Sequence, residues 1–153
     1  MMKTNSFASF FRTIKLFLIG KIKFINASIG DVFTMEDGMK FKVFRHVVIR
    51  PANKNISNPQ AVFRIRFQPK NMTVKQNKRF SWMPMLILMG FHGFRSKYWM
   101  VNEETGICQG VYEWDTLQDA ERYSKSIALR FITKRSVKGS VHYEIVDRIE
   151  NRL

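Results

Sequence analysis

The sequence contains few of the residues that form cross-links or cofactor sites. It has one cysteine in 153 residues, Cys108, which excludes an intrachain disulfide and a cysteine metal cluster. We expect this thiol to be a small, buried strand residue in a reducing compartment. The chain lacks the motifs of dinucleotide sites, nucleoside triphosphate sites, zinc hydrolases and serine hydrolases, and its three histidines are not at metal-ligand spacing. We therefore predict no cofactor and no metal.

Long hydrophobic runs are also missing. The longest uncharged stretch, 80–94, has 15 residues and includes a proline and two glycines, whereas a spanning helix needs roughly 18 to 20 apolar residues. We therefore predict that no segment crosses a membrane.

Acidic residues are absent from the first 30 positions. The whole chain has a formal charge of +14, of which residues 1–79 carry +13 and residues 80–153 only +1. Arg12, Lys15, Lys21 and Lys23 lie between apolar residues at helical spacing, which are Phe7, Phe10, Phe11, Ile14, Phe17, Leu18 and Ile22. The pattern predicts a basic amphipathic helix.

The sequence leaves two alternatives open for the surface that this helix contacts. Residues 5–25 could lie on an anionic membrane surface, or the helix could dock on its own domain or on a partner subunit. A secretory signal is disfavoured because Arg12 and Lys15 interrupt the apolar stretch, although an organelle presequence in a eukaryote would look the same. We expect a cytoplasmic protein, peripheral at the inner face of the membrane if the helix binds lipid.

Two further segments complete the N-terminal part. Residues 31–50 alternate apolar and basic side chains around Asp37-Gly38, which predicts a small β-hairpin. Residues 51–59 are turn-rich and poor in apolar side chains, which is typical of a linker. We therefore divide the chain into an extension, 1–59, and a domain, 60–153.

The sequence of the domain predicts strands and helices in a regular order. A strand at 61–67 precedes a polar connection at 71–79 and a helix from Ser81 to about Met89. Strands at 95–101 and 107–114 enclose a turn that ends in Gly106, and a helix capped by Asp115-Thr116 runs on until Gly139. A last strand covers 141–146. The order β, α, β, β, α, β predicts an α+β ferredoxin-like fold, with both helices on one face of a four-stranded antiparallel sheet. A dimer or the N-terminal region would cover the other face.

Residues 90–131 also resemble a known family. Gly93-Phe94, Lys97 with Trp99, the turn 103–106, Gly110 with Tyr112, and Ala120 with Tyr123 are similar, in order, to the YdhR-like monooxygenases of the dimeric α+β barrel superfamily. The resemblance covers roughly 60–147. It implies a homodimer whose subunits each hold an apolar cavity between sheet and helices. Members of this superfamily include cofactor-independent oxygenases of polycyclic aromatics and haem-degrading enzymes, and Asn102, His92 and Trp99 do not match the arrangement of the latter.

The candidate site residues follow from side-chain chemistry. His92, in a turn between glycines, and Tyr112 are candidate catalytic groups for proton removal. Aromatic, methionine and lysine side chains could bind an apolar or aromatic molecule, with core packing as the alternative for the aromatics. These candidates are Trp82, Met85, Lys97, Tyr98, Trp99 and Trp114.

The resulting hypothesis is a YdhR-like, cofactor-independent monooxygenase acting on an apolar or aromatic small molecule. One alternative is a non-catalytic, membrane-associated ligand-binding or interaction protein of the same fold. A second is a nucleic-acid-binding module, favoured by the pI near 10.3 but opposed by the missing RNP1 pattern.

Overall fold

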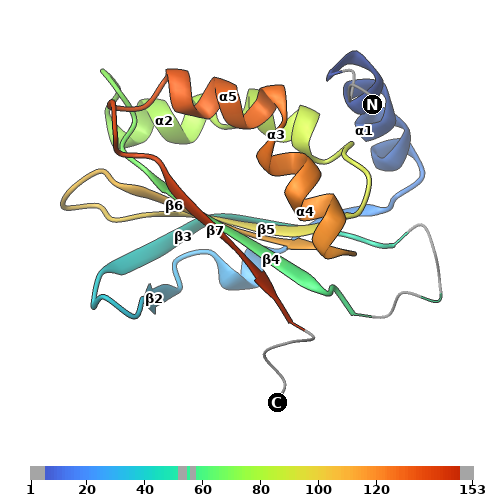
Figure 1. Cartoon of the computed structure of the whole chain (residues 1–153), viewed down its shortest axis with the longest axis horizontal. Coiled ribbons are helices and arrows are strands. Elements are labelled where there is room, and N and C mark those ends of the chain that lie inside the picture. The colour runs from blue at the N-terminus through green and yellow to red at the C-terminus, as the bar shows by residue number, and fades with distance from the viewer. Residues whose placement is uncertain (1–5, 52–54, 56–57, 149–153) are drawn as a thin grey trace.

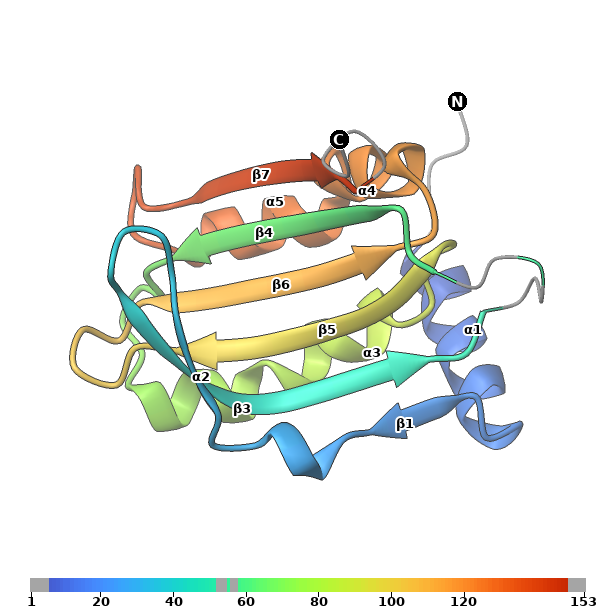
Figure 2. The same ribbon diagram turned by 90° about the horizontal axis from the view of Figure 1, so that it is seen from below.

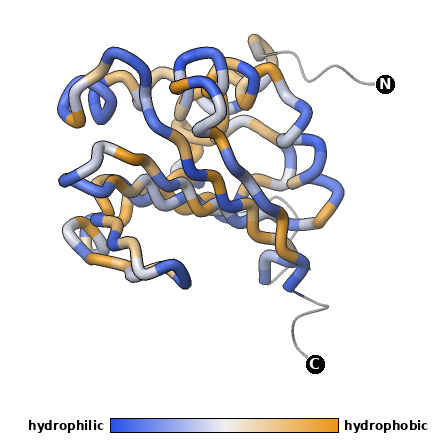
Figure 3. Tube along the Cα trace, turned by 60° about the vertical axis from the view of Figure 1, so that its left-hand side comes forward, coloured by the Kyte–Doolittle hydropathy of each residue, from blue (hydrophilic) through white to orange (hydrophobic). Residues whose placement is uncertain are grey.

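The computed structural model describes residues 6–51, 55 and 58–148, so much of the linker predicted at 51–59 lies outside the described residues. One antiparallel sheet forms the centre, and the helices lie on one of its faces (Figure 1). Hydrophobic and hydrophilic positions alternate along the strands (Figure 3), as expected for a sheet whose two faces differ in environment.

The ferredoxin-like prediction is confirmed. Strands β4 (Ala61–Phe67), β5 (Phe94–Val101), β6 (Cys108–Trp114) and β7 (His142–Asp147) are ordered β5-β6-β4-β7. All neighbours in this set pair antiparallel. The intervening chain forms helices above the sheet, as the βαββαβ order requires.

The predicted β5–β6 hairpin is also confirmed, and its register places the site residues. Asn102 Oδ1 accepts hydrogen bonds from the backbone N–H groups of Glu104 and Thr105, at 3.1 and 2.9 Å, and Gly106 has a φ of 73°. Lys97 lies opposite Tyr112 in the resulting ladder. Because side chains alternate along a strand, Lys97 and Trp99 share one face of β5, and Tyr98 lies on the other.

The sheet is larger than the four strands predicted. The N-terminal hairpin forms β2 (Val32–Thr34) and β3 (Lys40–Ile49), and β1 (Ile22–Phe24) also pairs with β3. Strand β3 pairs with β5 from Lys42↔Val101 to Val48↔Ser96 (Figure 2). The sheet therefore continues across the boundary that the sequence predicts at residue 60.

The 31–39 connection crosses the sheet face that the helices leave open (Figure 2). Asp37 and Glu36 accept hydrogen bonds from Arg66 and Arg64 of β4. A small apolar cluster of Phe41, Val43 and Met100 lies on the same side. The N-terminal region thus covers part of the open sheet face. It is one of the two covers predicted from the sequence, the other being a second subunit.

Two helix predictions need correction. The connection expected at 71–79 contains α2 (Val74–Phe80), which begins at a capping box formed by Thr73 and Gln76. Helix α3 (Trp82–Leu88) follows directly after Ser81. The single helix expected after Thr116 is two helices, α4 (Leu117–Ser124) and α5 (Ile127–Lys134), because Ser126 caps a new N-terminus by accepting from the Leu129 N–H.

The N-terminal helix α1 (Ser6–Leu18) is shorter than its apolar pattern suggests. Gly20, with a φ of 67°, ends it, and Ile22 belongs to β1 instead. Its backbone approaches the end of α3 so closely that a Cβ on Gly90 would lie 1.8 Å from the Ser9 carbonyl oxygen. None of the helices within the described ranges is long and apolar enough to span a bilayer.

Candidate functional site

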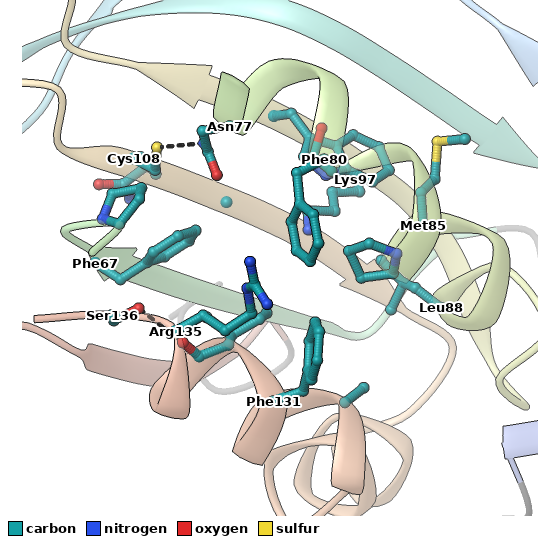
Figure 4. A pocket seen from close by; sticks show the side chains of 18 of the residues that line it. Phe67, Asn77, Phe80, Met85, Leu88, Lys97, Cys108, Phe131, Arg135 and Ser136 are labelled. Carbon is teal, nitrogen blue, oxygen red and sulfur yellow. Dashed lines mark hydrogen bonds between the residues drawn. The ribbon is translucent and has the colours of Figure 1, made fainter. Parts of the chain in front are cut away.

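A pocket lies between the sheet and the helices α2, α3 and α5 (Figure 4). Its floor is formed by inward-facing residues of β5 and β6, including Lys97, Trp99, Cys108 and Gly110, and its walls by Met85 and Leu88 of α3. Its lining is predominantly apolar and contains no aspartate or glutamate among the described residues. Such a site is suited to an apolar or electron-rich ligand.

The outer rim of the pocket comes from the helices. The Phe80 and Phe131 rings, from α2 and α5, stack with centroids 5.9 Å apart, and the Arg135 guanidinium lies 4.1 Å from the Phe80 centroid. Phe80 and Phe131 are partly exposed and Arg135 is exposed, whereas Lys97 and Trp99 are buried. The mouth therefore faces outward through the helical layer, and this stack narrows it.

The enclosed volume is about 70 Å³. Pockets that bury a drug-sized ligand hold roughly 300 Å³ or more. A polycyclic ligand would therefore have to separate Phe80 from Phe131 or leave part of itself in the rim.

Lys97 is the distinctive group of the pocket floor. Its Nζ donates to Tyr112 Oη at 2.6 Å and lies 4.3 Å from the Trp99 ring centroid and 4.0 Å from that of Tyr112. Its side chain is buried, and none of the carboxylates in the described part of the chain forms an ion pair with it.

Burial lowers the pKa of Lys97 well below its ordinary value, and the nearby Arg45 charge lowers it further. The two aromatic faces favour the ammonium form, by about 0.5–2 kcal/mol each. Desolvation of a buried charge costs several kcal/mol. The second effect is larger, so the net shift favours the neutral amine, the form that can accept a proton from a bound ligand.

Two buried tyrosines form a hydrogen-bonded chain with this lysine. Tyr123 Oη donates to Tyr112 Oη at 3.3 Å, and both rings are fully buried. Burial raises the pKa of Tyr112 well above its ordinary value and also raises that of Tyr123. Both phenols therefore remain protonated at neutral pH and position the lysine without acting as bases.

Arg45 connects β3 to the helices beside the pocket. It donates to Ser81 Oγ at 2.8 Å and to the Lys78 carbonyl oxygen at 3.1 Å, and its guanidinium lies 4.0 Å from the Trp82 ring centroid. Burial lowers the pKa of Arg45 to about 10, so it keeps its charge at neutral pH. The N-terminal strands thus supply a fixed cation that helps to deprotonate Lys97.

Cys108 lines the same floor but is not a nucleophile. Its Sγ accepts a hydrogen bond from Asn77 Nδ2 at 3.0 Å, and burial raises the pKa of the thiol to about 12. A thiol with this pKa is almost entirely protonated at neutral pH.

The structure brings together some of the residues predicted from the sequence and separates others. Met85, Lys97 and Trp99 line the pocket, and Tyr112 lies directly behind Lys97. Trp114 is fully buried in the main core, against Phe94 and Tyr123.

Three predicted residues lie elsewhere. His92 does not line the pocket: its side chain is 69% exposed and contacts Asp119 at 3.0 Å. Tyr98 faces the opposite side of the sheet, where its ring stacks on His46. Trp82, the first residue of α3, is half exposed and does not line the pocket; its ring contacts the Phe24 ring and the Arg45 guanidinium instead.

Several functional residues were missed by sequence reasoning. Phe80 lies between the connection expected at 71–79 and the helix expected from Ser81. Arg135 was expected only as a charge at a helix end, and Tyr123 only as part of a helix stripe. Arg45 was placed in the extension. Only the Thr73–Gln76 capping box could have revealed the helix that carries Phe80; the contact of Arg45 with Ser81 depends on pairing between distant strands.

The lysine pKa predicts a pH dependence of stability. Because the pKa is lowered in the folded state, the unfolded chain binds this proton at a higher pH, and the free energy of unfolding rises with pH up to the ordinary lysine pKa of 10.5. The slope is about 1.4 kcal/mol per pH unit within that window. Denaturant unfolding of the wild type and of Lys97→Met at several alkaline pH values measures this slope as the difference between the two proteins. Parallel curves would show that Lys97 stays charged in the fold.

No protein-family model and no curated protein matches the chain, but several solved structures do. An uncharacterised ferredoxin-fold protein related to antibiotic biosynthesis monooxygenases, from Listeria monocytogenes 4b F2365, has a TM-score of 0.54 at 14% identity, over 76% of this chain and 68% of that one. A heme-degrading enzyme from Listeria monocytogenes has a TM-score of 0.55 at 14% identity, over 74% and 73%. An anthrone oxidase-like protein has a TM-score of 0.50 at 13% identity, over 72% and 56%.

The chain therefore has the ferredoxin-like α+β fold that these monooxygenase-like and heme-degrading proteins share. At such low identities the likeness defines the fold, and chemistry has to be argued from the site. Membership of the YdhR-like family stays a prediction.

Proposed function

We propose that this protein is a cofactor-independent oxygenase of an apolar aromatic molecule with an acidic C–H or O–H group. The observation that carries the proposal is Lys97, a buried amine without a carboxylate partner among the described residues, at the floor of an apolar pocket. The monooxygenase-like neighbours support the reaction class.

Anthrone illustrates the chemistry in balanced form. The Lys97 amine removes a proton from the acidic ring carbon, and the resulting carbanion transfers electrons to O₂ and forms a C–O bond. The peroxide anion takes the proton back from the Lys97 ammonium, and the resulting hydroperoxide loses water to give the quinone, so one anthrone and one O₂ yield one anthraquinone and one water. The ammonium formed on Lys97 lies against the Trp99 and Tyr112 rings, which stabilise it while the ring carries the negative charge.

Oxygen consumption tests the proposal. The purified chain and anthrone are mixed in an oxygen electrode under metal-chelating conditions, and anthraquinone is measured by absorbance. We expect turnover well above the rate of spontaneous oxidation. Tight binding of anthrone without oxygen uptake would instead favour the non-catalytic ligand-binding alternative. The predicted homodimer is a separate expectation, which light scattering can check.

A further inference from the structure

Helix α1 packs small polar side chains on the protein and exposes its large apolar side chains, the reverse of an ordinary surface helix. Its buried positions are the small polar residues Ser9 and Thr13, at 3% and 2% exposure, and Thr13 Oγ1 donates to the Ser9 carbonyl oxygen. Phe11, Phe17 and Leu18 are 66%, 60% and 79% exposed. A surface helix normally packs its apolar stripe on the core, so this exposed stripe has to be explained by a contact outside the described chain.

The apolar surface continues from α1 onto its neighbours. Helix α1 packs on α3, whose Trp82, Met83 and Leu86 are 48%, 53% and 38% exposed. Ile127, at the start of α5, is 64% exposed on the same helical layer (Figure 1). We call this surface, formed by α1, α3 and the start of α5, the helical face.

Charge separates the helical face from the rest of the molecule. Helices α1, α2, α3 and α5 contain no carboxylate, and among the described helices only α4 does. Basic side chains are interspersed in this layer, from α1, α2 and α5; these are Arg12, Lys15, Lys75, Lys78, Arg79, Arg130 and Lys134. On the open face of the sheet, by contrast, Glu36, Asp37 and Glu144 pair with arginines.

We infer that the helical face binds an anionic lipid bilayer, with the apolar side of α1 inserted at the interface. Exposed aromatic and aliphatic side chains, flanked by cations on helices that themselves contain no carboxylate, fit a surface of acidic headgroups over acyl chains. A protein partner or a second copy would have to supply a surface that is both apolar and acidic, whereas an anionic bilayer presents both properties everywhere.

This orientation also gives the pocket a source of ligand. The mouth between Phe80 and Phe131 opens through the helical layer. In the bound state it would face the membrane, and a ligand too large for the enclosed volume could keep its remainder among the lipids. This last step rests on the proposed oxygenase function, but membrane binding does not.

Vesicle binding by the full chain tests the inference. We expect cosedimentation with phosphatidylcholine–phosphatidylglycerol vesicles and much weaker binding to phosphatidylcholine alone. The double variant Phe11→Ser/Phe17→Ser should weaken binding at least about tenfold, and Arg12→Gln/Lys15→Gln about 30-fold at low salt. Two double variants outside the helices serve as matched controls. Ile29→Ser/Val32→Ser, on the other side of the sheet, removes comparably exposed apolar groups, and Lys40→Gln/Lys42→Gln removes two cations of β3.

Trp82 provides a readout of orientation. It is the half-exposed tryptophan, in ring contact with Phe24, while Trp99 and Trp114 are buried. Vesicles with brominated acyl chains should quench its emission, and Trp82→Phe should abolish that quenching without preventing sedimentation.

Three results would overturn the inference. The first is absence of binding to anionic vesicles. The second is equal loss of binding in the control variants, and the third is conversion of a dimer to a monomer by Phe11→Ser/Phe17→Ser, which would make the helical face a subunit interface. Vesicle binding without anthrone oxidation would leave the inference intact and remove only the proposed function.

Discussion

Replacing Lys97 by methionine is expected to reduce anthrone-dependent oxygen uptake by about 10²- to 10⁴-fold, the usual contribution of a positioned acid or base. Methionine retains the apolar length of the side chain but cannot accept the proton. The variant should also be more stable than the wild type at neutral pH, because it removes a buried amine whose pKa is lowered by folding and which has no carboxylate partner in the described structure. Oxygen-electrode rates and denaturant unfolding measure the two effects.

Two controls separate chemistry from general damage. Lys75→Met removes an exposed lysine of α2 and should leave the rate unchanged. Lys97→Ala should lose activity but regain part of it when small primary amines are added, because an added amine can occupy the vacated space. If Lys97→Met keeps its activity while its stability rises, the lysine is not the base and the proposed mechanism is wrong.

Phe63→Ala is expected to give the largest loss of stability, about 3–5 kcal/mol. Phe63 is fully buried on β4, and its ring contacts those of Tyr112, Tyr123 and Tyr143 with centroids 5.1 to 5.3 Å apart. Truncation leaves a cavity that three aromatic rings cannot close without leaving their own contacts. Because small domains have only about 5–15 kcal/mol of stability, the midpoint of denaturant unfolding should fall sharply.

The control removes the same atoms at another place. Phe33, on β2, is 43% exposed and contacts the Tyr98 ring, so Phe33→Ala should cost less than about 1.5 kcal/mol. A similar loss of stability in both variants would mean that the aromatic cluster around Phe63 does not make a special contribution to the stability of the core.

Local sequence patterns were sufficient for the ferredoxin-like unit but not for its surroundings. Alternation in 61–67 and the turn ending at Gly106 define strands and a hairpin, and these signals act over a few residues. The pairing of β3 with β5 joins residues 48 to 59 positions apart in the sequence, from Val48↔Ser96 to Lys42↔Val101, and no periodicity within either segment contains that information. The helical spacing of apolar residues likewise predicted that Ile22 belongs to the N-terminal helix. This spacing gives no information on where a helix ends, which here is set by Gly20.

The site was predicted in part for the same reason. Lys97 and Trp99 were predicted as site residues because a lysine and a tryptophan in an apolar strand can both contact a ligand. Which strand residues face them across the hairpin depends on its register, which only the structure supplies. His92 attracted attention as a titratable residue between glycines, yet that turn directs it to Asp119 and solvent. The Phe80–Phe131 stack combines helices from opposite halves of the domain, a relation that exists only after folding.

The pairing of β3 along β5 also bears on the solubility of fragments. Residues 94–101 would form a long edge strand in a fragment that begins at residue 60, with unpaired backbone groups beside Tyr98 and Met100. Such edges recruit strands from other molecules. By pairing along this edge, the N-terminal strands protect the domain from aggregation, and we expect a fragment that lacks residues 1–59 to be less soluble than the whole chain.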